Sequence, residues 1–267
     1  MKDFSTCASV LRGENSCAAA EERSPWSFGG AKDRLQPSED EQALSKAEGI
    51  EDEAVYIPEH FRARNDADAL RFMQANPFAI LISNSDREPT ASHVPISVHA
   101  AEDQLILRGH VAKANPHWRC LEQQPQCLTI FHGPHSYVSP TLYSTSENVP
   151  TWNYGAVHVY GTARVFSAPD ALAGVLAELI AMFEPAYAKQ WANLSDSYRQ
   201  RMLGHIVGFE ITATKIEAKF KLSQNRSRGE QENVISSLDK AEDTVVSGVA
   251  RLMREQGLGS STKKEVE

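Results

Sequence analysis

The sequence predicts an α+β fold in which a β-barrel carries helices on its outside. Segments with alternating or continuous apolar residues recur at strand length between residues 78 and 222. Other segments, such as residues 167–183, carry apolar residues at helical spacing. Six or more strands with outer helices are typical of a single barrel domain of about 200 residues.

The first 54 residues are expected to form a disordered acidic extension. They hold six basic and twelve acidic residues, so −6 of the net charge of −8 lies in them. Such a polar segment buries too little apolar surface to offset the entropy of ordering. The rest of the chain, at −2, has no strong electrostatic attraction for nucleic acid. This argues mildly against a protein that acts by binding DNA alone.

The ordered domain is expected to begin near residue 55. Asp66 is a capping residue and predicts a helix over residues 66–75. Residues 78–83 and 91–98 are expected to be strands, separated by a turn. Pro95 cannot donate a ladder hydrogen bond, so the second strand should lie at an edge or contain a bulge.

The middle of the chain predicts further strands and helices. The expected strands are residues 104–110, residues 126–132, the neighbourhood of Tyr137, and residues 157–166. Asn115 and Pro116 should open a short helix. Ser167 with Asp170 resembles a capping box for a helix that ends near Phe183, and a second short helix is expected over residues 195–203.

Residues 207–222 are expected to form one long, bent strand. Its apolar residues alternate up to Ala213 and then resume in the opposite phase at Ile216, which is what a β-bulge produces. Residues 230–237 and 239–256 are expected to be helical, and residues 257–267 to form a polar tail. A helix-turn-helix within residues 170–203 stays open, although its acidic residues make it a poor reader of a DNA groove.

The cysteines and the hydropathy favour a cytoplasmic protein. Cys7, Cys17, Cys120 and Cys127 lack the spacing of a metal finger, so free thiols in a reducing compartment are expected. No run of eighteen apolar residues predicts a membrane span. Charged residues interrupt the N-terminal segment, which therefore does not read as a secretory signal.

The stretch of residues 131–160 has the most unusual composition. It contains four tyrosines, a tryptophan, three histidines and three prolines, with no lysine or arginine. Aromatic rings beside hydroxyl and amide groups suit the recognition of a flat molecule rich in heteroatoms. Aromatic rings that fill a core produce the same composition, so both interpretations stay open.

Four stretches together resemble one known family. They are GHVAKANPHW (residues 109–118), YVSP (137–140), VPTWNY (149–154) and KFKLSQNR (219–226). In this order they are similar to the PaiB-type FMN-binding negative transcriptional regulators, which in turn resemble the pyridoxamine-phosphate-oxidase group. The resemblance implies an FMN-binding split β-barrel with flanking helices, over residues 55–256. It also implies a homodimer with FMN in the cleft between the copies.

The resemblance gives two groups of residues a role toward FMN. Lys113, with the Asn115 amide and the amides that open the next helix, is expected to hold the phosphate; a solvated surface lysine is the alternative. Side chains from three further stretches are expected to contact the flavin ring or the phosphate. These are Ser139, Thr151, Trp152, Asn153, Lys221, Gln224, Asn225 and Arg226.

Three functions follow from the resemblance. The first is an FMN-binding transcriptional regulator, with possible DNA contact. The second is a flavin-dependent oxidoreductase, for which the sequence offers no evident acid–base pair and hence no catalytic residue. The third is a haem-binding split barrel with His93, His110 or His132 as axial ligand. His132 and His135 suggest a metal pair only weakly. These two are expected to lie in turns, as are His93, His110, His117 and His158.

Overall fold

The computed structural model describes residues 55–85, 88–101 and 104–259, which belong to one compact unit. Residues 1–54, expected to be a disordered extension, lie outside the described residues. So do residues 260–267, the greater part of the expected polar tail.

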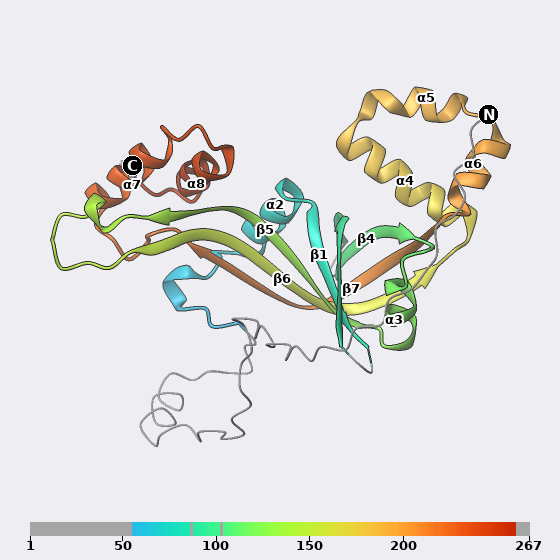
Figure 1. The fold of residues 1–267 in the computed structure, drawn as a ribbon, viewed down its shortest axis with the longest axis horizontal. Coiled ribbons are helices and arrows are strands. Elements are labelled where there is room, and N and C mark those ends of the chain that lie inside the picture. Colours follow the sequence, from blue (N-terminus) through green and yellow to red (C-terminus); the bar gives the residue numbers. More distant parts are fainter. Residues whose placement is uncertain (1–54, 86–87, 102–103, 260–267) are drawn as a thin grey trace, which may run out of the picture. The chain divides into compact units, whose positions relative to one another are not determined.

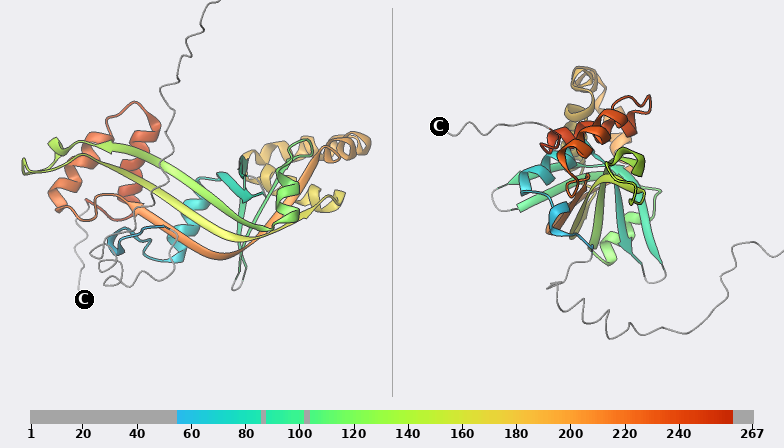
Figure 2. Two further views of the ribbon diagram at one scale, coloured as in Figure 1. Left: turned by 60° about the horizontal axis from the view of Figure 1, so that its bottom comes forward. Right: turned by 90° about the vertical axis from the view of Figure 1, so that its left-hand side faces the viewer.

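The described part of the chain forms one antiparallel sheet of seven strands in the order β2-β1-β5-β6-β7-β4-β3. The strands are β1 (Phe78–Asn84), β2 (Pro89–Pro95), β3 (Ser97–Ala101), β4 (Gln104–Ala112), β5 (Gln126–Val138), β6 (Thr151–Phe166) and β7 (Ile206–Lys221). The last three are the longest, and they curve together across the sheet (Figures 1 and 2).

The two edge strands of the sheet follow each other in the sequence. Ile96 alone separates β2 from β3; it is fully buried, and its N–H donates to the Pro77 carbonyl at 2.9 Å. The edges therefore come together without a ladder of hydrogen bonds between them, as in a split barrel. The prediction of one strand over residues 91–98 is wrong because Ile96 takes the chain from one edge to the other. The edge position expected of Pro95 is confirmed.

Two bulges bend the long strands. The β5–β6 pairing shifts between His132 and His135, so the two strands expected around residues 126–137 are one bulged strand. The β6–β7 pairing shifts between Tyr160 and Gly161, opposite the phase change expected in residues 207–222. That bulge is confirmed. Strand β6 begins six residues earlier than predicted, because the aromatic stretch at its start pairs with the end of β5.

Helices flank the sheet, and several of them gather at the two ends of the long strands (Figure 1). They are η1 (Glu59–Phe61), α2 (Asp66–Ala75), α3 (His117–Gln123), η2 (Pro140–Leu142), α4 (Pro169–Phe183), η3 (Pro185–Tyr187), α5 (Ala188–Asn193), α6 (Asp196–Leu203), α7 (Arg228–Leu238) and α8 (Thr244–Glu255). Helices α7 and α8 lie where β6 begins and β7 ends, and α4 to α6 lie at the opposite end (Figure 1). None of the helices in the described part of the chain is long and apolar enough to cross a membrane.

Three expected helix starts are corrected by the structure. Asn65, not Asp66, caps α2, by accepting the Asp68 N–H. The expected capping box at Ser167 is absent, since α4 begins with Pro169 and its cap makes no side-chain bond. Asp243 caps α8, so the helix expected from residue 239 begins later. A capping box does occur at the start of α7, between Ser227 and Glu230.

The core lies between the sheet and the helices α2, α7 and α8. Its largest fully buried side chains include Phe131 of β5 and both Phe209 and Phe220 of β7. Phe72 of α2 packs against Gly133 of β5 and Gly155 of β6. A side chain at either position would collide with its ring, since a Cβ at Gly155 would lie 2.6 Å away. The face of β5 to β7 that bears the aromatic stretch is left more open.

Candidate cofactor site

The residues expected to bind FMN lie at two opposite ends of the same strands. Lys113 follows β4 and donates its N–H to the His205 carbonyl at 2.8 Å, just before β7 begins. Lys221 is the last residue of β7. The two are separated by roughly 50 Å of extended strand, at about 3.3 Å per residue. One protomer therefore does not bring the two groups together around one mononucleotide.

At the end formed by β5, β6 and β7, three aromatic rings lie together on an open face. Trp152 and Tyr137 are cross-strand partners, each about half exposed, with ring centroids 6.5 Å apart. The His135 ring lies 5.8 Å from Trp152. We call His135, Tyr137 and Trp152 the ring surface. Because these rings are exposed, the interpretation that Trp152 fills the core is wrong, and the rings are free to stack on a flat ligand.

Lys221 and Thr151 lie beside the ring surface and bind each other. The Lys221 Nζ donates to the Thr151 hydroxyl at 2.5 Å. Burial, and then the neighbouring charge of Lys219, lowers the pKa of Lys221. Two ammonium groups on one face of a strand repel each other, so an anionic group placed there would be favoured. The Lys219 Nζ already donates to the Tyr56 carbonyl at 2.6 Å.

Asn153 points to the other side of the sheet and is fully buried. Its amide exchanges hydrogen bonds with the Ser223 hydroxyl, at 3.0 Å and 3.2 Å, and contacts the Met253 sulfur at 3.7 Å. Ser223 has a φ of +66°, which a residue other than glycine adopts rarely. Asn153 thus holds the turn after β7 in place, and its hydrogen-bonding groups face the protein interior.

Gln224 and Arg226 are also engaged within the protein. The Gln224 side chain folds back, accepting the Leu222 N–H at 2.7 Å and donating to the Phe220 carbonyl. The Arg226 guanidinium stacks 3.9 Å above the Tyr143 ring and donates to the Asn148 amide oxygen at 2.7 Å. Both side chains fix the turn and the loop before β6, so their contribution to the site is to support it.

Ser139 closes the end of β5. Its hydroxyl pairs with the Thr141 hydroxyl at 2.8 Å and accepts the Thr141 N–H at 3.2 Å, which caps the short helix η2. This position lies beside Val138, the residue that pairs with Thr151 in the neighbouring strand. Ser139 is therefore close to the ring surface along the chain, but its hydroxyl is already hydrogen-bonded within the turn.

At the other end, Lys113 is exposed and the Asn115 side chain is occupied. No described residue pairs with the Lys113 ammonium; the main-chain carbonyl of Lys113 accepts the Trp118 indole N–H at 3.0 Å. The Asn115 side chain donates to Ser92 at 3.1 Å and accepts the His117 N–H at 3.0 Å. The helix amide expected to meet a phosphate is thus taken by Asn115, which leaves Lys113 as the open cation here.

The six histidines expected in turns lie in regular elements instead. His132 and His135 flank the bulge of β5, and His93, His110 and His158 lie in strands. His117 opens α3, where its ring binds the Ser83 and Ser92 hydroxyls, and burial lowers its pKa. Within the described residues, no group of three or more side chains is placed to hold a metal ion.

The residues that sequence reasoning missed are Tyr137 and His135 as partners of Trp152. They lie at the end of β5, and a loop with the short helix η2 separates them from Trp152 in β6. Period-two alternation in residues 135–138 and 151–154 was the signal that places these rings on one face. The bulge between His132 and His135 hid that signal by shifting the phase of the strand.

The comparison with known proteins decides the family. Residues 55–215, more than half of the chain, match the family model described as "Putative FMN-binding domain". The chain belongs to this family. It is also 37% identical over 204 residues to the "Protease synthase and sporulation protein PAI 2" of Bacillus subtilis, covering 76% of this chain and 98% of that protein. The PaiB-type resemblance is thereby confirmed.

Two further similarities are more distant. An uncharacterized protein of Emericella nidulans is 30% identical over 230 residues, which cover 70% of this chain and 91% of that protein. The solved flavocytochrome Anf3 of Azotobacter vinelandii is 12% identical with a TM-score of 0.49, and 62% of this chain and 72% of that chain are covered. The split-barrel assignment therefore rests on the family match and on the strand order.

FMN is the cofactor of this family, and the side chains of the site suit it. The ring surface offers exposed aromatic faces to a planar ring, while Lys113 and Lys221 offer ammonium groups to a phosphate. A bound flavin supplies hydride or single-electron transfer, and the protein supplies binding and orientation. In this chain, binding and orientation would fall to open side chains at the two ends of β7.

Proposed function

We propose that this protein is an FMN-binding regulator that acts as a cytoplasmic homodimer, with each flavin held between the two copies. The main support for this proposal is that the ring surface and Lys113 lie at opposite ends of β7. The ring surface, with Lys221 beside it, lies at one end and the open Lys113 at the other, so one chain does not bring Lys113 to the rings. A second copy running in the opposite direction would bring the two groups together.

In this proposal, the ring surface binds the flavin ring. Tyr137 and Trp152 are 50% and 51% exposed, a large apolar area for a protein surface. They lie on strands whose other face is buried against α8, so their positions are fixed by a packed element. Rigid rings on strands orient a planar ligand more tightly than rings on a loop.

Lys113 of the partner subunit would then meet the phosphate. Its backbone is held on both sides, by the His205 carbonyl and the Trp118 indole, while its ammonium group stays open. An open, positioned ammonium group binds a phosphate by charge-assisted hydrogen bonds. Closed two-fold symmetry would supply two identical sites per dimer.

The regulatory role is taken from the relatives. The Bacillus subtilis relative is named for protease synthesis and sporulation, which are processes and not a reaction. The net charge of −8 gives the chain no broad attraction for DNA, so direct operator contact is the weaker part of this proposal. Cys120 and Cys127 are both free thiols, which fits the reducing conditions of the cytoplasm.

A flavin-dependent oxidoreductase is the second candidate. The observation that favours it is the open ring surface, because a second planar molecule has room to approach a flavin bound there. Incubation of the FMN-loaded protein with reduced nicotinamide cofactors and an added electron acceptor, which reoxidises the flavin, separates the two roles. Steady consumption of the reductant at many turnovers would identify an enzyme, whereas a single reduction of the bound flavin would fit a sensor.

The dimer proposal is tested by adding FMN at several protein concentrations. A ligand held only by the dimer stabilises the dimer by mass action. FMN should therefore raise the melting temperature and lower the dimer dissociation constant together. A protein that stays monomeric while its FMN affinity is unchanged on dilution would refute the shared site. The absorbance spectrum of the same samples separates flavin from a haem-binding protein.

A further inference from the structure

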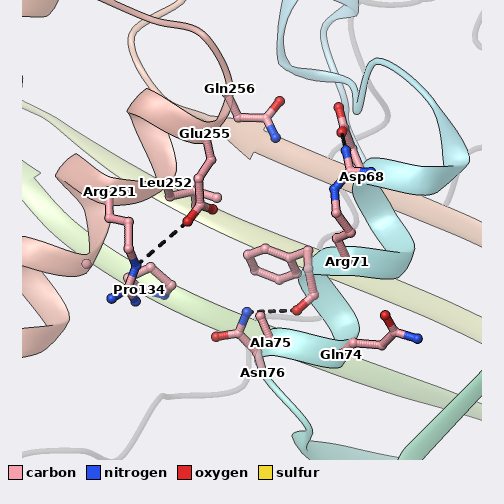
Figure 3. A pocket seen from close by; sticks show the side chains of 12 residues that line it. Asp68, Arg71, Gln74, Ala75, Asn76, Pro134, Arg251, Leu252, Glu255 and Gln256 are labelled. Atoms are coloured by element: carbon pink, nitrogen blue, oxygen red, sulfur yellow. Dashed lines mark hydrogen bonds and ion pairs between the residues drawn. The ribbon is translucent and has the colours of Figure 1, made fainter.

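A cavity of about 510 Å³ lies between α2 and α8, away from every residue discussed so far as a flavin ligand. Figure 3 shows its two helical walls and the Pro134 side chain from the β5 bulge. Its volume is within the range of small-molecule sites in proteins. The cavity is on the core side of β5 and β6, whereas the ring surface is on their other face.

The floor of the cavity is apolar and held in a fixed position. It consists of the Phe72 ring, Leu252 and Pro134. The Phe72 ring lies so close to the strands that a Cβ at Gly133 would be 2.5 Å from it, and one at Gly155 would be 2.6 Å away. The two glycines thus give the ring room against the sheet, and the ring lines the bottom of the cavity.

The walls are tied together at one end. Arg64, just before α2, donates to the Gln256 carbonyl at the end of α8 at 3.3 Å. Near the other end, α8 approaches the bulge so closely that a Cβ at Gly248 would lie 2.9 Å from the Pro134 side chain. The cavity is therefore bounded by contacts on both sides, and it is not an accidental gap between two loosely placed helices.

The rim carries two arginines, Arg71 and Arg251, which balance the charges of Asp68 and Glu255, and Arg64 adjoins it from outside the cavity. The Asp68 side chain is only 1% exposed, and its two oxygens accept from Arg64, at 2.8 Å, and from Arg71. Two guanidinium groups thus share one buried carboxylate on the α2 wall. On the α8 wall, Arg251 is 75% exposed and lies 3.8 Å from Glu255, which is a loose ion pair. Arg71 is 66% exposed, so a ligand meets an arginine on each wall.

The geometry points to a second ligand site, for a small flat molecule that carries one anionic group such as a carboxylate, sulfonate or phosphate. The flat body would lie against the Phe72 ring and Leu252, with the anionic group between Arg71 and Arg251. Arginine presents a planar fork that suits such oxygen groups, and an aromatic floor suits a flat body. This inference is independent of the proposed flavin site, because no residue is shared between them.

The test uses the fluorescent dye 8-anilinonaphthalene-1-sulfonate as an anionic aromatic probe and full-length protein saturated with FMN. One dye per chain should bind. Arg71→Gln and Arg251→Gln should each weaken it by about tenfold, the usual size of one charge-assisted bond. Ala75→Phe, which fills the cavity without a change of charge, should abolish binding. N-phenyl-1-naphthylamine, which lacks the sulfonate, should not respond to either arginine variant.

Arg228→Gln is the matched control. Arg228 forms the same type of helical ion pair, with Glu232 of α7 at 2.9 Å, and lies outside the cavity. It should leave dye binding unchanged. The inference would be overturned if the dye affinity were unchanged in Arg71→Gln, Arg251→Gln and Ala75→Phe. So would displacement of the dye by FMN in the protein before saturation, because the cavity would then be the flavin site itself.

Discussion

Replacing Lys113 with alanine should weaken FMN about tenfold and leave riboflavin almost unaffected. The Lys113 side chain is exposed, and only its backbone is hydrogen-bonded, to the His205 carbonyl and from the Trp118 indole. Its removal should therefore change the free energy of unfolding by less than about 0.5 kcal/mol. A charge-assisted bond contributes about 1.5–3 kcal/mol, and exposure favours the lower end, which is close to tenfold in affinity.

Trp152→Ala provides the contrast, since FMN and riboflavin share the ring that Trp152 would stack on. Trp152 is half exposed beside the His135 and Tyr137 rings, so its loss should cost little stability. Aromatic stacking contributes about 0.5–1.5 kcal/mol beyond the buried area. FMN and riboflavin should therefore both lose affinity by the same factor, which lies between about twofold and about twelvefold.

The assay is a titration of each variant with each ligand, followed by quenching of flavin fluorescence. Equal weakening of FMN and riboflavin by Lys113→Ala would refute the assignment of the phosphate to Lys113, and so would no effect on either. Lys221 would then be the first residue to test, because its ammonium group is beside the ring surface while Arg226 is already stacked on Tyr143.

Two further predictions concern stability. Gly155→Ala should lower the free energy of unfolding by about 1–3 kcal/mol in chemical denaturation, because its Cβ would press on the Phe72 ring. Gly174→Ala in α4, where a Cβ would meet nothing within 4 Å, should raise the free energy of unfolding by about 0.5–1 kcal/mol. A similar loss of stability at both sites would contradict this reasoning. Hydrogen bonds from the Ser144 N–H, the Ser144 hydroxyl and Ser227 lower the pKa of Glu230 to about 2. The stabilisation by Glu230 should be complete above about pH 4.5 and lost as the pH falls toward 2. Thermal melting of Glu230→Gln should show a flatter acid limb, and an unchanged limb would contradict the assignment.

The long strands and most helices were predictable because their apolar periodicity is local. The β7 bulge could be read from a phase change between Ala213 and Ile216. The closure of the barrel could not be predicted. It depends on the chain passing at Ile96 from β2, at one edge of the sheet, to β3, at the other edge. The cap of α4 was misread because Ser167 lies one residue too early, before Ala168 and Pro169.

The candidate site was predictable in its residue types and not in its arrangement. Motif positions alone did not show that Lys113 and Lys221 lie at opposite ends of β7, because separation in space depends on strand register. They also did not show which polar side chains are already occupied. Asn153, Gln224 and Arg226 carry suitable groups, but each is bonded within the protein. Exposure distinguishes Trp152 from these residues.

The shared site is tested most directly by mixing Lys113→Ala and Trp152→Ala subunits and letting the dimers reassort. If each flavin site takes Lys113 from one copy and the ring surface from the other, every mixed dimer regains one intact site. With random assortment, about a quarter of all sites should then bind FMN with the affinity of the unmodified protein. If both groups act within one copy, no mixed dimer contains an intact site. A mixture with no recovered high-affinity fraction would contradict the account.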